Sequence, residues 1–210
     1  MKPALGAVYM KTAGKMQMWG KIQINTAVQQ ELTWFVEHVR SSDGIFFFDS
    51  MVWCDDDHTH STLTIYVDAS SHVIGIWFLL EKMGYQCPLP PGTPTDAIFF
   101  FKALAICCTV HLTSSFPHAT RLHIVTDNTN TFDIFGSLSA LPSYNSILIS
   151  TVDVLLRTNI DLCVIHIPGT QNVIADALSQ YHNELATKLV DGLTICTFQP
   201  PRNALGVIKK

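Results

Sequence analysis

Short apolar runs alternate with longer ones over residues 60–182, and this alternation restricts how the chain can fold. The short runs are rich in β-branched and aromatic residues, which is typical of strands, and the long runs are typical of helices. Strands are expected at residues 63–70, 73–81, 121–127 and 161–169, with a short one near Tyr85, and helices at 96–113, 129–138, 141–158 and 171–185. This order predicts an α/β fold in which helices pack on both faces of a mixed sheet.

Composition supports a folded chain without a strong electrostatic partner preference. Hydrophobic residues make up 48% of the 210 residues and charged residues 14%, so enough apolar surface is available for a core. The net charge of -4 excludes a polycation that holds nucleic acid by bulk charge. A nucleic-acid partner would therefore need local basic groups or bound metal ions.

No targeting or membrane segment is visible in the sequence. The N-terminal residues lack the apolar stretch of a secretory signal, and the long apolar run at 98–112 is interrupted by Lys102. The six cysteines contain no CxxC pair, which argues against a structural zinc site and fits a reducing compartment. We expect an intracellular protein that is not secreted and has no membrane partner.

Two flanking segments surround the central region. In residues 1–57, a helix is expected at 25–39 and a strand is possible at 45–53. His58 and His60 follow three aspartates, so this stretch either holds a transition metal or is a solvated acidic loop. Residues 183–210 include Pro200 and Pro201 and are expected to form an extended C-terminal tail.

Three aspartates stand at the ends of apolar elements. Asp68 and Asp127 close strand-like runs, and Asp176 lies early in the last helix. A carboxylate in an apolar strand costs several kcal/mol unless it is paired or bound to metal. A convergent acidic cluster that attracts Mg²⁺ is one interpretation. The alternative is that each aspartate forms a turn or caps a helix.

The motifs VDAS (67–70), VTDN (125–128) and HIPGTQNVIADALSQ (166–180) resemble the ribonuclease H domain of retrotransposon Pol polyproteins and their reverse transcriptases. The gypsy-like and DIRS-like branch found in fungi is the most similar. The resemblance covers residues 58–182 and implies a ribonuclease H-like fold with a five-stranded mixed sheet. It implies two-metal hydrolysis of RNA in RNA–DNA hybrids with Mg²⁺ or Mn²⁺. The implied partners are the hybrid and the reverse transcriptase polymerase domain, and residues 1–57 then resemble a remnant of that enzyme's thumb and connection.

The resemblance also assigns site residues. Of the four family carboxylates, three map onto Asp68, Asp127 and Asp176, which would be metal ligands and catalytic residues. The fourth, a glutamate on the first long helix, is replaced by Lys102. Because an ammonium repels divalent cations and cannot ligate them, hydrolysis is expected to be impaired. The alternative is a non-catalytic nucleic-acid-binding domain or an inert retroelement fragment.

Four further residues are candidates for contact with nucleic acid: Ser70, Asn128, His166 and Asn172. Asn128 either caps the following helix or contacts substrate. His166 is either a core or edge histidine or a residue that lines the site. Asn172 precedes Asp176 by one helical turn, so it either caps or orients the loop or contacts a phosphate.

Overall fold

A computed structural model describes residues 5–15, 19–41, 62–89, 98–116, 119–141, 143–202 and 204. The possible strand at 45–53 and the segment with His58 and His60 lie outside the described residues. The elements are α1 (Gly6–Thr12), α2 (Thr26–Ser41), β1 (Thr62–Ala69), β2 (Val73–Phe78), β3 (Met83–Pro88), α3 (Ile98–Thr113), β4 (Arg121–Thr126), α4 (Thr129–Ser137), α5 (Asn145–Thr158), β5 (Asp161–His166), η3 (Gly169–Gln171), α6 (Val173–Ser179), α7 (Asn183–Leu189) and β6 (Thr194–Thr197).

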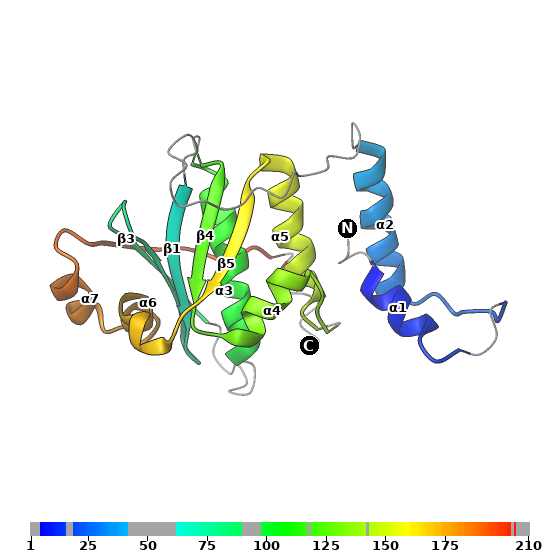
Figure 1. The fold of residues 1–210 in the computed structure, drawn as a ribbon, viewed down its shortest axis with the longest axis horizontal. Helices are drawn as coiled ribbons and strands as arrows, with labels where there is room; N and C mark the ends of the chain where they lie inside the picture. The colour runs from blue at the N-terminus through cyan, green and yellow to red at the C-terminus, as the bar shows by residue number, and fades with distance from the viewer. Residues whose placement is uncertain are drawn as a thin grey trace.

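The centre of the molecule is a six-stranded sheet with the strand order β5-β4-β1-β2-β3-β6 (Figure 1). Strands β1, β2 and β3 form an antiparallel meander, while β4 runs parallel to β1 and β5 runs parallel to β4. The predicted mixed α/β fold class is confirmed, and the five expected strands are all present. The sixth strand, β6, adds to the edge of β3 in the parallel direction.

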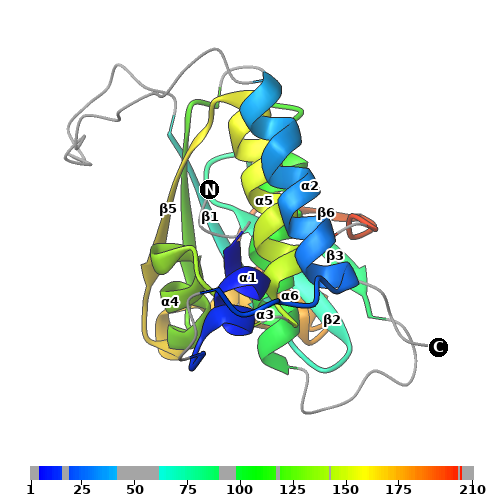
Figure 2. The same ribbon diagram turned by 90° about the vertical axis from the view of Figure 1, so that its right-hand side faces the viewer.

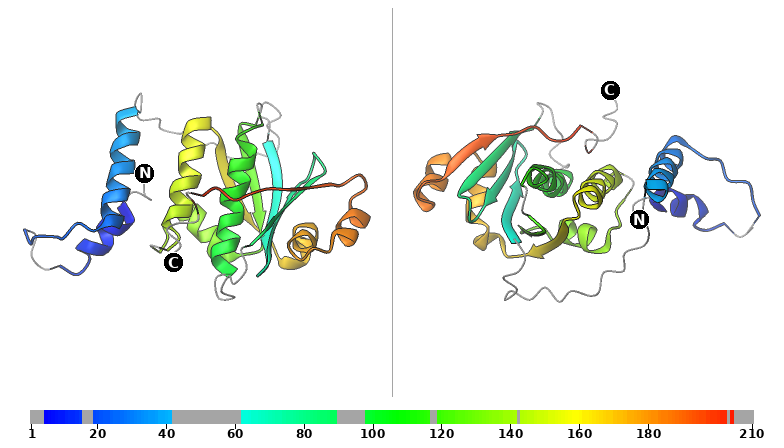
Figure 3. Two further views of the ribbon diagram at one scale, coloured as in Figure 1. Left: turned by 180° about the vertical axis from the view of Figure 1, so that it is seen from behind. Right: turned by 90° about the horizontal axis from the view of Figure 1, so that it is seen from above.

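Helices cover both faces of the sheet, as predicted. Figure 1 and Figure 3 show α3, α4 and α5 on one side and α6 and α7 on the other, and Figure 2 looks onto the side of α3 and α5. The main core lies under α3, which is mostly apolar and is buried along most of its length. A second, smaller core joins α6 and α7 to β2 and β6, and includes Trp77, Leu178 and Ile195. In the described part of the chain, no helix has the length and apolar character needed to cross a membrane.

The expectation of an extended C-terminal tail is wrong for the residues that the structure describes. Residues 183–197 form α7 and β6, and the chain then crosses α3 towards α5 (Figure 3, left). Phe198 packs against the main core, and Ala204 is fully buried in it. Ser146 on α5 donates a hydrogen bond to the Ala204 carbonyl at 3.1 Å. The crossing segment, residues 198–202 together with Ala204, is called the C-terminal strap below.

Helix α6 lies unusually close to β2, and Gly75 permits this approach. Gly75 is paired with Asp68 in the sheet. A Cβ atom at Gly75 would lie 2.5 Å from the Ser179 nitrogen and 2.7 Å from the Ala175 carbonyl oxygen. Both atoms belong to the α6 backbone, so the helix itself would have to move. Gly75 therefore sets the height of α6 above the strand that carries Asp68.

We expect Gly75→Ala to lower the free energy of unfolding by about 3 kcal/mol, at the upper end for overpacked sites. Urea denaturation would measure the loss. The matched control is Gly136→Ala in α4, where an added Cβ would meet no atom within 4 Å. This control should be neutral or stabilising by up to about 1 kcal/mol, because alanine favours helix. Equal stabilities for the two variants would contradict the close-packing argument.

Candidate functional site

The parallel pairing of β1 and β4 brings two of the predicted aspartates to the same end of the sheet. Tyr66 is paired with Val125, so Asp68, two residues further along β1, lies beside Asp127, directly after β4. Helix α3 covers the neighbouring face and carries Lys102 at the start of its second turn. These three side chains come from segments far apart in the sequence.

Lys102 forms ion pairs with both aspartates, and its contact with Asp127 also has hydrogen-bond geometry. Its Nζ atom lies 2.7 Å from Asp68 Oδ1 and 2.8 Å from Asp127 Oδ1. The exposed fractions of the side chains are 17% for Lys102, 6% for Asp68 and 21% for Asp127. The ammonium group thus sits between the two carboxylates in a place largely screened from water, where charge-assisted hydrogen bonds are strong.

The second oxygen of Asp68 is held by a residue to which the sequence analysis gave no role. Ser179, fully buried on α6, donates from Oγ to Asp68 Oδ2 at 2.7 Å. The only sequence signal for this contact was the position of Ser179 inside the ADALS motif. Both oxygens of Asp68 are therefore engaged, one by the Lys102 ammonium and one by the Ser179 hydroxyl.

Burial and charge act against each other in this cluster. Burial raises the pKa of Asp68, and Lys102 and Ser179 lower it again without cancelling the rise. For Lys102, burial disfavours the ammonium, but the attraction of Asp68 and Asp127 outweighs burial and raises the pKa of Lys102. The lysine is accordingly charged at neutral pH, and it is the main group that compensates the buried carboxylate.

The third predicted aspartate makes different contacts. Oδ1 of Asp176 accepts a hydrogen bond from Gln180 Nε2 at 2.6 Å on the exposed side of α6. Within the described ranges, no group of three or more histidine, cysteine, aspartate or glutamate side chains is arranged to hold a metal ion. Together with the ammonium between Asp68 and Asp127, this means that the residues present do not fit a pair of divalent cations.

Two of the predicted nucleic-acid contacts hold a helix start and a turn in place. Asn128 caps α4, because its Oδ1 accepts hydrogen bonds from the Thr131 nitrogen and hydroxyl, each at 2.8 Å, so the capping alternative is confirmed. Ser70 donates from Oγ to the Ser179 carbonyl at 2.7 Å and accepts from the nitrogen of Val73 at 3.1 Å. Ser70 thereby ties the β1–β2 turn to α6.

The other two candidates lie at the end of β5 and at the start of α6. Asn172 has 1% of its surface exposed and donates from Nδ2 to the Val67 carbonyl at 3.0 Å, so it orients the start of α6 against β1. His166, the last residue of edge strand β5, is exposed, with Nε2 3.2 Å from the Asp127 carbonyl oxygen. Its place on the edge strand is confirmed, and its ring is open to solvent beside the ion pairs.

Solved structures with similarity to this chain include ribonucleases H. A ribonuclease H1 from the halophilic archaeon Halobacterium salinarum NRC-1 has 13% sequence identity and a TM-score of 0.47, covering 60% of this chain and 100% of that chain. LC11-RNase H1 in complex with an RNA/DNA hybrid has 14% identity and a TM-score of 0.47, covering 59% and 99%. The N-terminal RNase H domain of a Mycobacterium tuberculosis protein has 12% identity and a TM-score of 0.44, covering 58% and 98%.

No protein-family model matches the sequence, and no curated protein matches it either. The identities to the solved structures are low, so the function of this chain has to be argued from the geometry of its own site.

Proposed function

We propose that this chain is the ribonuclease H-like domain of a retrotransposon reverse transcriptase that binds RNA–DNA hybrids while Lys102 suppresses their hydrolysis. The observation that carries the proposal is the pair of ion pairs from Lys102 to Asp68 and Asp127, at 2.7 and 2.8 Å. The retroelement context is supported by the VDAS, VTDN and HIPGTQNVIADALSQ motifs. The first two contain Asp68 and Asp127, and the third contains His166 and Ser179, which contact these aspartates.

Electrostatics explains why the site would cleave poorly. In the ribonuclease H family that this sequence resembles, four carboxylates neutralise two divalent cations. Here the ammonium already neutralises one carboxylate charge and occupies the space between Asp68 and Asp127. A divalent cation about 4 Å from the ammonium would be repelled by about 2 kcal/mol even in bulk water, and by more in a cleft. Weak cation affinity follows, and with it slow hydrolysis.

Binding of the hybrid would use the edge of the site that remains open. The exposed ring of His166 beside Asp127 offers a polar contact at the end of β5. Asn128, Asn172 and Ser70 hold the surrounding loops through hydrogen bonds of 2.7–3.1 Å. These bonds restrict the conformations of the loops that form this surface. With a net charge of -4, the chain should bind weakly, and any affinity that comes from phosphate contacts should fall as salt rises.

A labelled RNA–DNA hybrid tests both parts of the proposal. We expect low-salt binding that weakens with added salt, and no cleavage above background with millimolar Mg²⁺ or Mn²⁺. His166→Ala should weaken binding, whereas His72→Ala in the β1–β2 turn is the control and should not. Robust cleavage that is abolished by Asp68→Asn would overturn the suppressed site. Absence of binding at low salt would favour the inert-fragment alternative.

A further inference from the structure

His166 is held on three sides at the point where β5 ends. Its backbone pairs with Thr126 of β4, and the nitrogen of Ile167 donates to the Thr126 carbonyl at 3.0 Å. Nε2 of His166 lies 3.2 Å from the Asp127 carbonyl oxygen. The third neighbour is the Phe132 ring on α4, whose centroid lies 6.5 Å from that of the imidazole. These contacts restrain the imidazole ring at the edge of the candidate site.

The contact with Asp127 decides which nitrogen of the His166 ring carries the proton. A carbonyl oxygen can only accept a hydrogen bond, so Nε2 must donate its N–H to it. A neutral imidazole has a single N–H, so Nδ1 is then left as an acceptor. No described residue is bonded to Nδ1, and the side chain is exposed. The ring therefore presents an acceptor to a ligand that approaches from solvent.

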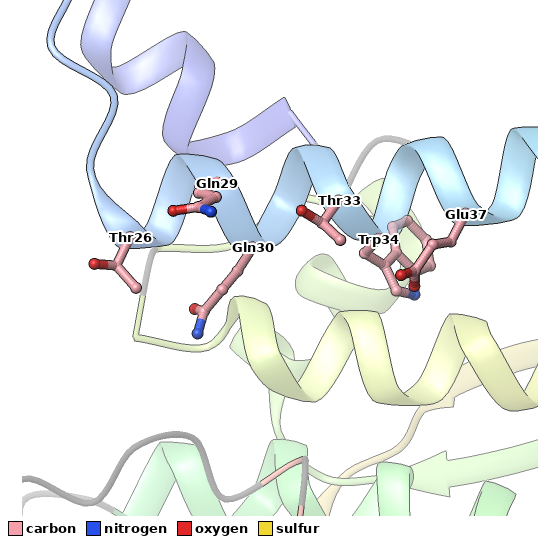
Figure 4. Close-up of a pocket in the computed structure, with 6 residues that line it drawn as sticks. All are labelled: Thr26, Gln29, Gln30, Thr33, Trp34 and Glu37. Carbon is pink, nitrogen blue, oxygen red and sulfur yellow. The ribbon is translucent and has the colours of Figure 1, made fainter.

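His166 lies on the open surface and lines neither of two hollows elsewhere in the described structure. One hollow, of about 400 Å³, is lined by six residues of α2 (Figure 4), and the other, of about 510 Å³, lies at residues 181–185. Phe132, beside the imidazole, is also open to solvent, with 39% of its surface exposed. A group that meets Nδ1 is therefore best carried by a large molecule that lies across this surface.

The charge next to His166 selects the kind of group that can approach. Lys102 supplies one positive charge against the carboxylates of Asp68 and Asp127, so these three side chains together have one net negative charge. Phosphate oxygens are repelled by this charge, and as acceptors they have no proton to donate to Nδ1. A hydroxyl group meets neither obstacle, because it is neutral and can donate a hydrogen bond.

We propose that Nδ1 of His166 accepts a hydrogen bond from a ribose 2′-hydroxyl, so that this residue distinguishes RNA from DNA at the edge of the site. The inference rests on the proposed function, because it requires a hybrid that lies across the ion pairs. A-form helices display their 2′-hydroxyls in a wide and shallow minor groove, and this hydroxyl is the group by which a protein tells RNA from DNA. The exposed part of the Phe132 ring provides an apolar surface for the sugar beside the acceptor.

Fluorescence anisotropy with the full chain tests this inference at low salt and pH 8, where imidazole groups are in general neutral. The affinity for an RNA–DNA hybrid is compared with that for the same hybrid carrying 2′-fluoro groups throughout its RNA strand. A 2′-fluoro group keeps the sugar pucker of RNA but cannot donate a hydrogen bond. We expect the unmodified hybrid to bind about fivefold more tightly, which is the effect of one neutral hydrogen bond.

Variants show whether His166 is the acceptor. His166→Leu should bind both hybrids equally, with the affinity that the wild-type chain has for the 2′-fluoro hybrid. His72→Leu, in an exposed turn, is the matched control and should keep the fivefold preference. Because both histidines are exposed, neither substitution should unfold the chain, and thermal melting checks this.

Four results would refute the assignment of the 2′-hydroxyl to His166. The first two are equal affinities of the wild-type chain for the two hybrids and a preference that survives in His166→Leu. The third is an equal loss for both hybrids in His166→Leu, which indicates a phosphate contact. The fourth is a loss that disappears when inosine replaces guanine, which indicates a contact with the guanine amino group. Absence of binding to either hybrid would instead refute the proposed function, and this inference with it.

Discussion

Replacing Lys102 by methionine should lower the free energy of unfolding by about 3–5 kcal/mol at neutral pH, the range for a broken buried ion pair. Methionine keeps much of the length and apolar stem of lysine but removes the charge. Asp68, with 6% of its side chain exposed, would then keep only the Ser179 hydrogen bond. Asp127 would also lose its ammonium partner, but its side chain is more exposed to water, so the cost in stability is smaller there.

The pH dependence of this loss has a definite sign. Burial already raises the pKa of Asp68 in the folded protein, and removing the ammonium raises it further. A carboxyl group with a raised pKa is stabilising when protonated and loses that contribution as pH rises through its pKa. The deficit of Lys102→Met should therefore be largest near and above neutral pH and shrink as the solution is acidified through the pKa of Asp68.

Chemical denaturation at several pH values measures both effects. The control is Lys188→Met, which removes an exposed lysine on α7 and should change stability by less than about 0.5 kcal/mol. A deficit for Lys102→Met as small as that of the control would show that the two ion pairs contribute little. A deficit that stays constant with pH would show that Asp68 is not the group left uncompensated.

Lys102→Glu should make the stability of the protein depend on divalent cations. This variant places a third carboxylate beside Asp68 and Asp127, so the cation-free form should be less stable than wild type through like-charge repulsion. Added Mn²⁺ or Mg²⁺ should reverse the loss, by about 2.7 kcal/mol when the free cation exceeds its dissociation constant a hundredfold. Thermal melting with increasing cation concentration measures this gain, and cleavage of an RNA–DNA hybrid should appear with it.

The matched control for this experiment is Lys102→Gln. It removes the ammonium without supplying a carboxylate, so its melting temperature should respond to cations no more than that of the wild-type chain. A melting temperature of Lys102→Glu that is equally insensitive to Mn²⁺ and Mg²⁺ would mean that the cluster cannot hold these ions even with its charge reversed. The Lys102 ammonium would then not be sufficient to explain why the site binds cations weakly.

Most of the sheet domain could be predicted because its elements carry strong local patterns. The runs around Asp68 and Asp127 are apolar and β-branched, and α3 is mostly apolar apart from Lys102 and His111, so these elements can be recognised from their local sequence. The position of Lys102 at the site came from the family resemblance, because no periodicity relates a residue of α3 to the end of β1. The structure provides the distances that the resemblance lacked.

Other features could not be predicted because they are created by contacts between distant segments. Strand β6 has only four residues and is defined by its pairing with β3. The predicted last helix is broken near Tyr181, whose positive φ of 58° ends α6 before α7 begins. The contact of Ser179 with Asp68 and that of Asp176 with Gln180 depend on side-chain direction, which the motif does not specify.

The C-terminal strap changes where the smallest autonomous folding unit ends. The family resemblance stops at residue 182, but the buried Ala204 and the packed Phe198 belong to the same core as α3. A fragment cut at residue 182 would uncover the outer surface of α3 and leave the edge of β3 unpaired, and such bare edges favour self-association. We therefore expect the smallest stable unit to extend at least to Ala204, beyond residue 182, where the sequence resemblance stops.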